Sequence, residues 1–284
     1  MIKLFHLFDD DFQSQNAAKC DLLIHIGFET FQYAVVDIVR DELKSLAEYQ
    51  IPPSAHNPQD LISAIEKLPE YPREFKFPFN KISLSFDTLS YTLIPESLYN
   101  EESKEQYAGY FQSAVPGVIL SNTIKSEKIR NIFSINKELY ADMNRIFNKP
   151  HIYSQSCTFI EGIKKTYKEL TINTLYIDIH EKHVQLALFN NSGLSFYNIF
   201  DCQNADELNY FILNTIETLQ LLTKEISVIL SGRINSDDEY YNRVKKYFNK
   251  ISFADSRLIV NHSPKFDGIS SHTYFSLICL DQCE

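Results

Sequence analysis

A chain of 284 residues with a net charge of −10 is a poor candidate for binding nucleic acid, because neutralising phosphates requires a basic face. Hydrophobic residues make up 44% of it and charged residues 23%, as in ordinary globular proteins, and no stretch reaches the ~18–20 apolar residues of a membrane helix. The five cysteines are scattered without metal-site spacing, which indicates reduced thiols and a cytoplasmic protein.

The first predicted element is a β-hairpin over residues 23–37, where apolar and polar residues alternate. It is preceded by a short apolar run that Asp9-Asp10-Asp11 ends without a cleavage site, so we expect no signal peptide. After the hairpin the pattern predicts, in order, a strand over 46–51, a helix opening at Asn57-Pro58 and a buried strand over 82–86. An asparagine cap followed by proline is typical of a helix start.

The middle of the chain adds further elements before a predicted boundary. These are a helix over 101–114, strands over 118–122 and 128–134, and a helix over 136–147. Lys149-Pro150 marks the boundary, so we expect two lobes, 1–150 and 151–284, with the extra elements in the first.

The hairpin pattern returns 153 positions later, over residues 176–190, so that Ile24 superimposes on Ile177 without a gap. A strand over 194–200, a helix capped by Asn204 and a buried strand over 226–230 follow in the order of the first copy. The chain then continues with a predicted helix over 237–248, a strand over 257–261 and a helix over 274–283. Four matched elements in matched order indicate an internal duplication.

A duplicated set of three antiparallel strands, a crossover helix and a parallel strand resembles the ribonuclease-H-like fold in its actin-like ATPase form. The detail resembles an uncharacterised bacterial family of unknown function with this fold. The resemblance rests on IGFETFQYA (26–34), YTLIPESLY (91–99), LSFYNIF (194–200) and residues 274–284. It implies an α/β protein of two ribonuclease-H-like lobes, each a mixed sheet opening with a three-strand antiparallel meander, and it implies no activity.

Superfamily members that hydrolyse ATP use two phosphate-binding hairpins, each with an aspartate at the strand end and a glycine in the turn. In the first hairpin of this chain, His25 stands at the position of the acid. Gly27 keeps the turn glycine, and Phe28 takes the hydroxyl position, followed by Glu29 and Thr30. A carboxylate such as Glu29 held ~4 Å from a phosphate oxygen would cost on the order of 4 kcal/mol.

The second hairpin and the adenosine position are altered in a complementary way. Asp178 keeps the acid, whereas His180 replaces the glycine. A later strand of the superfamily ends in a glycine pair under the adenosine; here Ser231-Gly232 fits and Arg233 displaces the second glycine. The sequence therefore favours a pseudo-ATPase that acts as a scaffold or regulatory partner of another protein, with no resident cofactor and no nucleic-acid or membrane partner.

Other interpretations remain open at this point. In a divergent ATP-dependent enzyme, Asp178 would position Mg²⁺ and Gly232 would pack against adenine. Alternatively, His25, His180 and Arg233 bind a different small anion, or the turn residues have purely structural roles. The sequence His180-Glu181-Lys182-His183 has a three-residue histidine spacing instead of the four of a helical zinc motif, so we expect a solvated turn and no metal.

Overall fold

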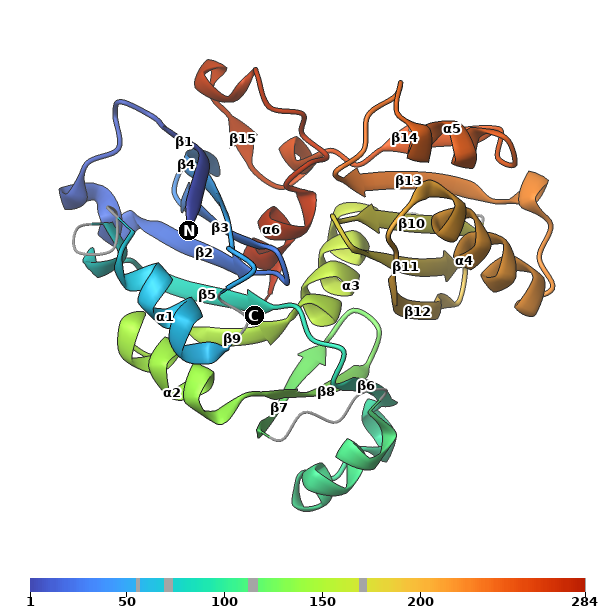
Figure 1. The fold of residues 1–284 in the computed structure, drawn as a ribbon, viewed down its shortest axis with the longest axis horizontal. Helices are drawn as coiled ribbons and strands as arrows, with labels where there is room; N and C mark the ends of the chain where they lie inside the picture. Colours follow the sequence, from blue (N-terminus) through green and yellow to red (C-terminus); the bar gives the residue numbers. More distant parts are fainter. Residues whose placement is uncertain (55–56, 69–73, 112–116, 169–172, 284) are drawn as a thin grey trace. The chain divides into compact units, whose positions relative to one another are not determined.

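The computed structural model describes residues 1–54, 57–68, 74–111, 117–168 and 173–283, and Figure 1 shows its elements in chain order. Contacts within the chain define two compact units. The first unit comprises Met1–Ile163, Arg257–Gly268 and Leu277–Glu284, and the second comprises Lys164–Ser256 and Ile269–Ser276.

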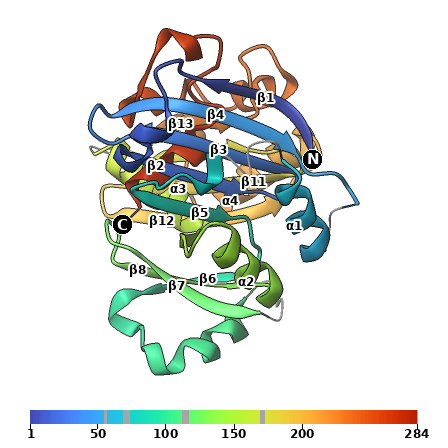
Figure 2. The ribbon, with the colours of Figure 1, turned by 90° about the vertical axis from the view of Figure 1, so that its left-hand side faces the viewer.

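The main sheet of the first unit contains both the predicted meander and strands that the sequence did not indicate. Its order is β1-β4-β3-β2-β5-β9, with β15 also pairing β4. The strands are β1 (Ile2–Phe8), β2 (Cys20–Ile26), β3 (Thr30–Asp37), β4 (Glu42–Gln50), β5 (Lys81–Phe86), β9 (His151–Ser154) and β15 (Asn261–His262). β2, β3 and β4 are antiparallel neighbours and β5 joins β2 in parallel, as predicted. Figure 2 shows β4 between β1 and β3.

Two helices of the first unit begin at asparagine caps, and they pack against each other. The side chain of Asn57 accepts a hydrogen bond from the Asp60 N–H (2.8 Å) at the start of α1 (Pro58–Glu66). The side chain of Asn136 accepts from the Glu138 and Leu139 N–H groups at the start of α2 (Lys137–Ile146). These caps satisfy N–H groups that have no partner within the helix.

A second, smaller sheet of the first unit has the order β6-β8-β7. Its strands are β6 (Tyr91–Pro95), β7 (Val118–Ile124) and β8 (Ile129–Ile135). The helix predicted over 101–114 is the 3-10 helix η4 (Glu101–Tyr110), which buries no residue, and residues 112–114 lie outside the described part of the chain. The sequence of η4 lacks a continuous apolar stripe, so it cannot dock on the sheet as an amphipathic α-helix.

The second unit repeats the meander of the first. Its sheet has the order β12-β11-β10-β13-β14. The strands are β10 (Thr174–Ile179), β11 (His183–Asn190), β12 (Gly193–Asp201), β13 (Ser227–Gly232) and β14 (Lys250–Phe253), and the helices are α4 (Ala205–Thr218) and α5 (Glu239–Lys245). β10, β11 and β12 are antiparallel and β13 joins β10 in parallel. The side chain of Asn204 caps α4. The predicted duplication is therefore present in the fold.

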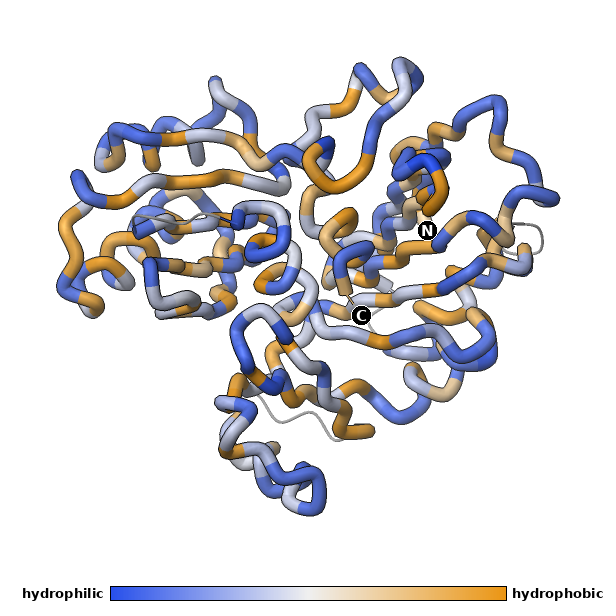
Figure 3. Tube along the Cα trace, turned by 180° about the vertical axis from the view of Figure 1, so that it is seen from behind, coloured by the Kyte–Doolittle hydropathy of each residue, from blue (hydrophilic) through white to orange (hydrophobic). Residues whose placement is uncertain are grey.

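The core of each unit lies between its main sheet and the helices that cover it. In the second unit, Ile177 of β10, Leu186 of β11 and Leu208 and Ile212 of α4 are almost fully buried in one apolar cluster. In the first unit, the ring of Phe75 packs edge-on against that of Tyr33, with the centroids 5.0 Å apart. Figure 3 shows how hydrophobic and hydrophilic residues are distributed along the chain trace.

The chain beyond the second copy of the unit departs from the predicted elements. The strand predicted over 257–261 is a 3-10 turn, η6 (Ser256–Leu258), followed by the two-residue strand β15, which pairs β4 of the first unit. The helix predicted over 274–283 is the shorter α6 (Phe275–Cys279), continued by the 3-10 helix η8 (Leu280–Gln282). Within the described residues, every helix is too short or too polar to cross a membrane.

The units also differ from the predicted ranges 1–150 and 151–284. The chain after Pro150 continues as β9, which pairs in parallel with β5, and then as α3 (Gln155–Thr166). Both β9 and most of α3 therefore belong to the first unit, and so does the end of the chain. Pairing with a distant strand places β9 there, which the local sequence does not reveal.

Candidate functional site

The first candidate half-site is the turn between β2 and β3. The Gly27 N–H donates to the Thr30 carbonyl (2.8 Å), which closes the turn. A Cβ on Gly27 would lie 3.1 Å from Asp87 Oδ2, 3.2 Å from Thr30 Oγ1 and 3.3 Å from His25 Nε2. Three polar side chains thus lie close to the place that a side chain at position 27 would occupy. Gly27 therefore has a packing role, because it leaves room for them.

His25, at the acid position, is part of a buried polar group on β2. Its Nδ1 and Ser85 Oγ of β5 share a hydrogen bond of 2.7 Å, and its Nε2 lies 3.4 Å from Asp87 Oδ1. Asp87 follows β5 directly, and its N–H donates to the Ile26 carbonyl (3.0 Å). Sequence reasoning missed Asp87, because only the parallel pairing of β5 with β2 places it beside the hairpin.

Phe28 and Glu29 occupy the tip of the same turn. The Glu29 carbonyl accepts from the Ile51 N–H (2.8 Å), which ties the turn to the end of the meander. The Phe28 side chain is 41% exposed. A cavity of about 260 Å³ lies beside it. Its lining residues are the apolar Phe28, Phe86, Leu89, Ile135 and Leu139 and the polar Asp87, Thr88, Ser90, Ser134 and Asn136. The tip of this turn is therefore bordered by a cavity whose walls are both apolar and polar, with the carboxylate-bearing Asp87 among them.

The second candidate half-site is centred on Asp178, the last polar residue of β10, which is 1% exposed. Its Oδ2 accepts hydrogen bonds from Ser276 Oγ (2.5 Å), His180 Nε2 (2.8 Å) and Gln185 Nε2 (3.2 Å). Its Oδ1 accepts from Ser231 Oγ (2.8 Å). A carboxylate has about four lone-pair positions. Four side chains of the same unit therefore donate to Asp178, three of them to Oδ2 and one to Oδ1.

The charge of Asp178 is stabilised by this surrounding network. Burial raises the pKa of its carboxyl, but the charge of His180 and the hydrogen bonds from His180, Ser276 and Ser231 outweigh that effect. The pKa of Asp178 consequently lies below its ordinary value, and the group is a buried carboxylate at neutral pH.

Gly232, at the end of β13, is held in a left-handed conformation with φ of +82°. A Cβ there would lie 2.2 Å from the Ile179 carbonyl oxygen, and the Gly232 N–H donates to the His272 carbonyl (3.0 Å). The next residue, Arg233, donates its N–H to the Ile179 carbonyl (2.7 Å), and its guanidinium lies 3.7 Å from Glu181 Oε1. Glycine is required here by both conformation and space.

His180 and His183 flank the turn of the second hairpin. Their rings stack with centroids 4.2 Å apart and an interplanar angle of 7°. Glu181 and Lys182 between them are exposed, as expected of a solvated turn, but His183 is buried on β11. Side chains alternate between the two faces of a strand, and that of His183 points inward. The spacing of the two histidines alone did not predict this burial.

The structure groups the predicted site residues within each unit. In the first unit His25, Gly27 and Thr30 converge with Asp87, and in the second unit Asp178, His180, Ser231 and Gly232 converge. Gln185 and Ser276 complete the second group and were not singled out in the sequence. A repeated Gln, at 32 and 185, could have indicated Gln185, whereas nothing local distinguishes Ser276, 98 residues from Asp178.

Comparisons with known proteins agree with this architecture. Residues 9–251 match the family described as "Protein of unknown function (DUF3822)". No curated protein sequence matches the chain. A solved protein from Bacteroides thetaiotaomicron VPI-5482, described as having an actin-like ATPase fold and unknown function, superimposes with a TM-score of 0.78. It is 18% identical, and the match covers 96% of this chain and 99% of that one.

Two further solved structures are less similar. The PilM-PilN type IV pilus biogenesis complex gives a TM-score of 0.65 at 13% identity, covering 93% of this chain and 98% of that one. The ethanolamine utilization protein EutJ from Carboxydothermus hydrogenoformans gives 0.50 at 6% identity, covering 94% and 89%. At these identities the likeness shows the fold, and it confirms the predicted resemblance: the protein has the actin-like ATPase fold, and the chain belongs to the DUF3822 family.

Proposed function

We propose that this protein is a pseudo-ATPase, a non-catalytic member of the actin-like fold that acts as a scaffold or regulatory partner of another protein. The observation that carries the proposal is the internal hydrogen bonding of Asp178, whose Oδ2 already accepts three hydrogen bonds and whose Oδ1 accepts one. This is the one acid retained from the two phosphate hairpins, and four side chains of its own unit already donate hydrogen bonds to it. An acid that orders the hydration shell of Mg²⁺ must offer lone pairs to metal-bound water.

The first hairpin supports the same proposal. The acid position holds His25, a neutral or cationic group that cannot assist Mg²⁺ binding as a carboxylate does, and its Nδ1 is engaged by Ser85. The small volume over Gly27 is bordered by Asp87, whose carboxylate would repel a phosphate placed there. Both hairpins thus use their polar residues internally.

The cavity beside Phe28 supports a protein as the partner. An exposed phenyl ring next to a cavity of about 260 Å³, of whose ten lining residues five are apolar, suits an apolar side chain of a partner protein. A phosphate in the same cavity would meet the carboxylate of Asp87. The net charge of −10 disfavours nucleic acid and anionic membranes as partners. Five free, buried thiols support a place in the reducing cytoplasm of a bacterium. A neighbour of the same fold was solved in the PilM-PilN complex, so the fold is compatible with such a role.

The partner is tested by affinity purification from the native host with mass spectrometry. The bait chains are the wild type, Phe28→Asp, and Leu222→Asp as the matched control. Leu222 is 53% exposed and lies in the second unit, and it is not among the residues that line the cavity. We expect a protein that the wild type and Leu222→Asp retain and Phe28→Asp loses. An identical set of proteins on all three baits would contradict docking at Phe28.

A second candidate function is a divergent ATP-dependent enzyme. It is favoured by the left-handed Gly232 at the end of β13 and by the ionised Asp178 beside it, both of which such an enzyme would use. Thermal unfolding with millimolar ATP and Mg²⁺ separates the two functions. The pseudo-ATPase is expected to show no shift in melting temperature. A saturable rise that Asp178→Ala and Gly232→Arg both abolish would favour the enzyme instead.

A further inference from the structure

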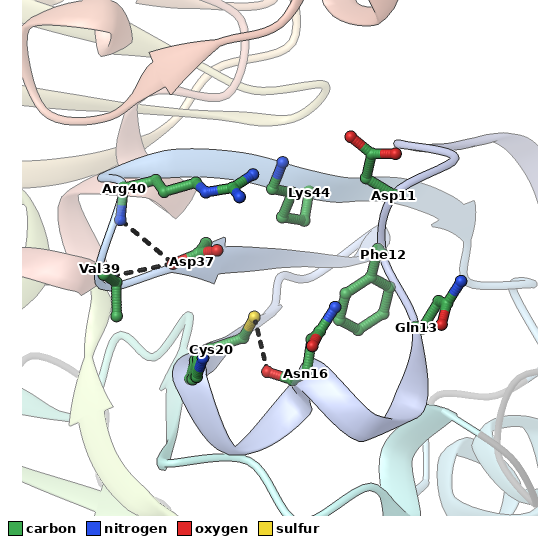
Figure 4. A pocket seen from close by; sticks show the side chains of 10 residues that line it. Asp11, Phe12, Gln13, Asn16, Cys20, Asp37, Val39, Arg40 and Lys44 are labelled. Atoms are coloured by element: carbon green, nitrogen blue, oxygen red, sulfur yellow. Dashed lines mark hydrogen bonds between the residues drawn. The ribbon is translucent and has the colours of Figure 1, made fainter.

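A cavity of about 440 Å³ lies in the first unit at the other end of the meander from the Gly27 turn. Figure 4 shows its walls, which come from the segment after β1, the start of β2, and the turn between β3 and β4. Cys20 begins β2 and Gly27 follows its end, so the length of β2 separates this cavity from the first hairpin. Its volume falls in the range of roughly 300–1,000 Å³ typical of small-molecule sites.

Three cationic side chains line the cavity: Lys19, Arg40 and Lys44. Within the described part of the chain, no carboxylate pairs with Lys19 or Arg40. Lys44 is 4% exposed, and its Nζ lies 2.6 Å from Glu42 Oε2 and 3.5 Å from Asp9 Oδ2. Burial alone would lower the pKa of Lys44. The two carboxylates raise it by more than burial lowers it, so the pKa lies above its ordinary value and Lys44 is a cation. Figure 4 shows the Arg40 side chain extending toward Lys44.

The remaining polar walls can accept and donate hydrogen bonds. Asp37 Oδ1 accepts from the N–H groups of Val39 (2.9 Å) and Arg40 (3.2 Å), which shapes the turn and leaves the second carboxylate oxygen for a ligand. The amide side chains of Gln13 and Asn16 line the same space, together with the carboxylate of Asp11. Carboxylates accept from hydroxyl groups, and amides both donate and accept.

Two further residues limit the kind of ligand that the cavity can bind and the reaction that it can carry out. The aromatic residue Phe12 lines the cavity. Cys20 is buried, and burial raises the pKa of its thiol to about 11, so it lines the cavity as a neutral thiol that donates to the Asn16 carbonyl (3.5 Å). A thiol with this pKa is a poor nucleophile at neutral pH, which favours binding over covalent chemistry at this position.

We propose that this cavity binds a hydroxylated organic anion of the sugar phosphate or sugar acid class. Arg40 and Lys19 hold the phosphate or carboxylate, because an arginine fork and a lysine without carboxylate partners are suited to that group. Asp37, Asn16 and Gln13 hydrogen-bond the hydroxyl groups. The apolar face of the sugar ring packs on Phe12. A purely anionic ligand would be opposed by Asp11 and Asp37, so the hydroxyl groups are part of the recognition.

Isothermal titration of the full chain tests this site with four probes: glucose 6-phosphate, glucuronate, inorganic phosphate and glucose. We expect saturable binding of glucose 6-phosphate or glucuronate, whichever anion fits, and at least roughly tenfold weaker binding of inorganic phosphate and glucose. Arg40→Gln and Lys19→Gln should each weaken that binding at least about tenfold, because each removes a charged hydrogen bond. Both side chains are exposed, so the fold should tolerate the changes.

The matched control is Lys224→Gln, which removes an exposed lysine of the second unit. It should leave the affinity unchanged. Three results would overturn the proposal. The first is no saturable binding of either sugar anion at millimolar concentration, and the second is an affinity for inorganic phosphate or for glucose that equals the affinity for the sugar anion. The third is an equal loss of affinity in Lys224→Gln and Arg40→Gln.

Discussion

At the scale of single residues, the two copies of the repeated unit place equivalent polar groups around the ends of β2 and β10. Each copy has one residue on the first strand, a glutamine opposite it on the second strand and a serine opposite it on the parallel strand. The sets are His25, Gln32 and Ser85 in the first copy and Asp178, Gln185 and Ser231 in the second. The same frame therefore holds a base in one copy and an acid in the other, and the serine bonds the exchanged residue in both.

The glycine at the end of β13 gives a direct stability prediction. Gly232→Ala must place a Cβ about 2.2 Å from a backbone oxygen at a φ of +82°. We expect the free energy of unfolding to fall by roughly 1–3 kcal/mol, measured by denaturant titration. Gly268→Ala is the matched control, since a Cβ there meets nothing within 4 Å. Equal stability of the two variants would show that β13 tolerates a side chain at its end.

Because of His272, we expect the stability of the fold to depend on pH. Burial lowers the pKa of His272 below 6.5, although its Nε2 donates to the Ile234 carbonyl (2.7 Å), which opposes the shift. The unfolded chain therefore binds a proton that the folded chain excludes. The contribution of the neutral ring to stability is complete above about pH 6.5 and is lost as the pH falls below that value.

Melting temperatures between pH 7.5 and pH 5 test this effect. We expect His272→Gln to show a smaller fall over that interval than the wild type, because its amide keeps a donor without taking up a proton. His151→Gln, which replaces an exposed histidine, should retain the wild-type fall. If the melting temperature of His272→Gln fell with pH as steeply as that of the wild type, His272 would not be the source of the pH dependence.

At the scale of elements, the strands of the repeat were predictable because alternation and apolar runs record their burial, and the asparagine caps at 57 and 204 marked two helix starts. β9 and β14 have four residues each, too few to show a period. Asp87 and Ser276 reach the candidate half-sites through strand pairing and a distant helix, and local sequence carries no signal of either.

The crossing of α3 and α6 gives a prediction at this scale. A Cβ on Gly162 of α3 would lie 2.3 Å from both Cβ and Sγ of Cys279 and 3.1 Å from its Cα. Since the obstruction includes main-chain atoms, Gly162→Ala should displace the C-terminal segment as a whole. That segment is also held by the Lys81 Nζ hydrogen bond to the Cys283 carbonyl (2.6 Å).

Thiol counting with a chromogenic reagent measures the displacement. All five cysteines are buried in the wild type, so we expect slow reaction. Gly162→Ala should expose Cys279 and Cys283 and release them to fast reaction. Gly109→Ala, at a position where a Cβ meets nothing within 4 Å, is the control. Slow reaction of all five thiols in Gly162→Ala would contradict the close crossing.

At the scale of the whole molecule, the actin-like fold is intact while the residues at its usual chemical positions are engaged in packing. The meander, crossover helix and parallel strand occur twice with matching register. The first hairpin carries His25 on β2 and Phe28 in its turn, and the second hairpin carries His180, where the resemblance to ATPases of this fold leads us to expect other residues. This contrast between complete architecture and internally used polar groups is the basis for regarding the protein as a pseudo-ATPase.

The most direct test of that claim is phosphate release from Mg·ATP by the purified full chain, compared with Asp178→Asn. The asparagine keeps the shape of Asp178 but cannot serve a metal as a carboxylate does. We predict that neither protein releases phosphate above the rate in buffer, whatever the protein concentration. Phosphate release that increases with wild-type concentration and disappears in Asp178→Asn would contradict the pseudo-ATPase and identify Asp178 as part of a working site.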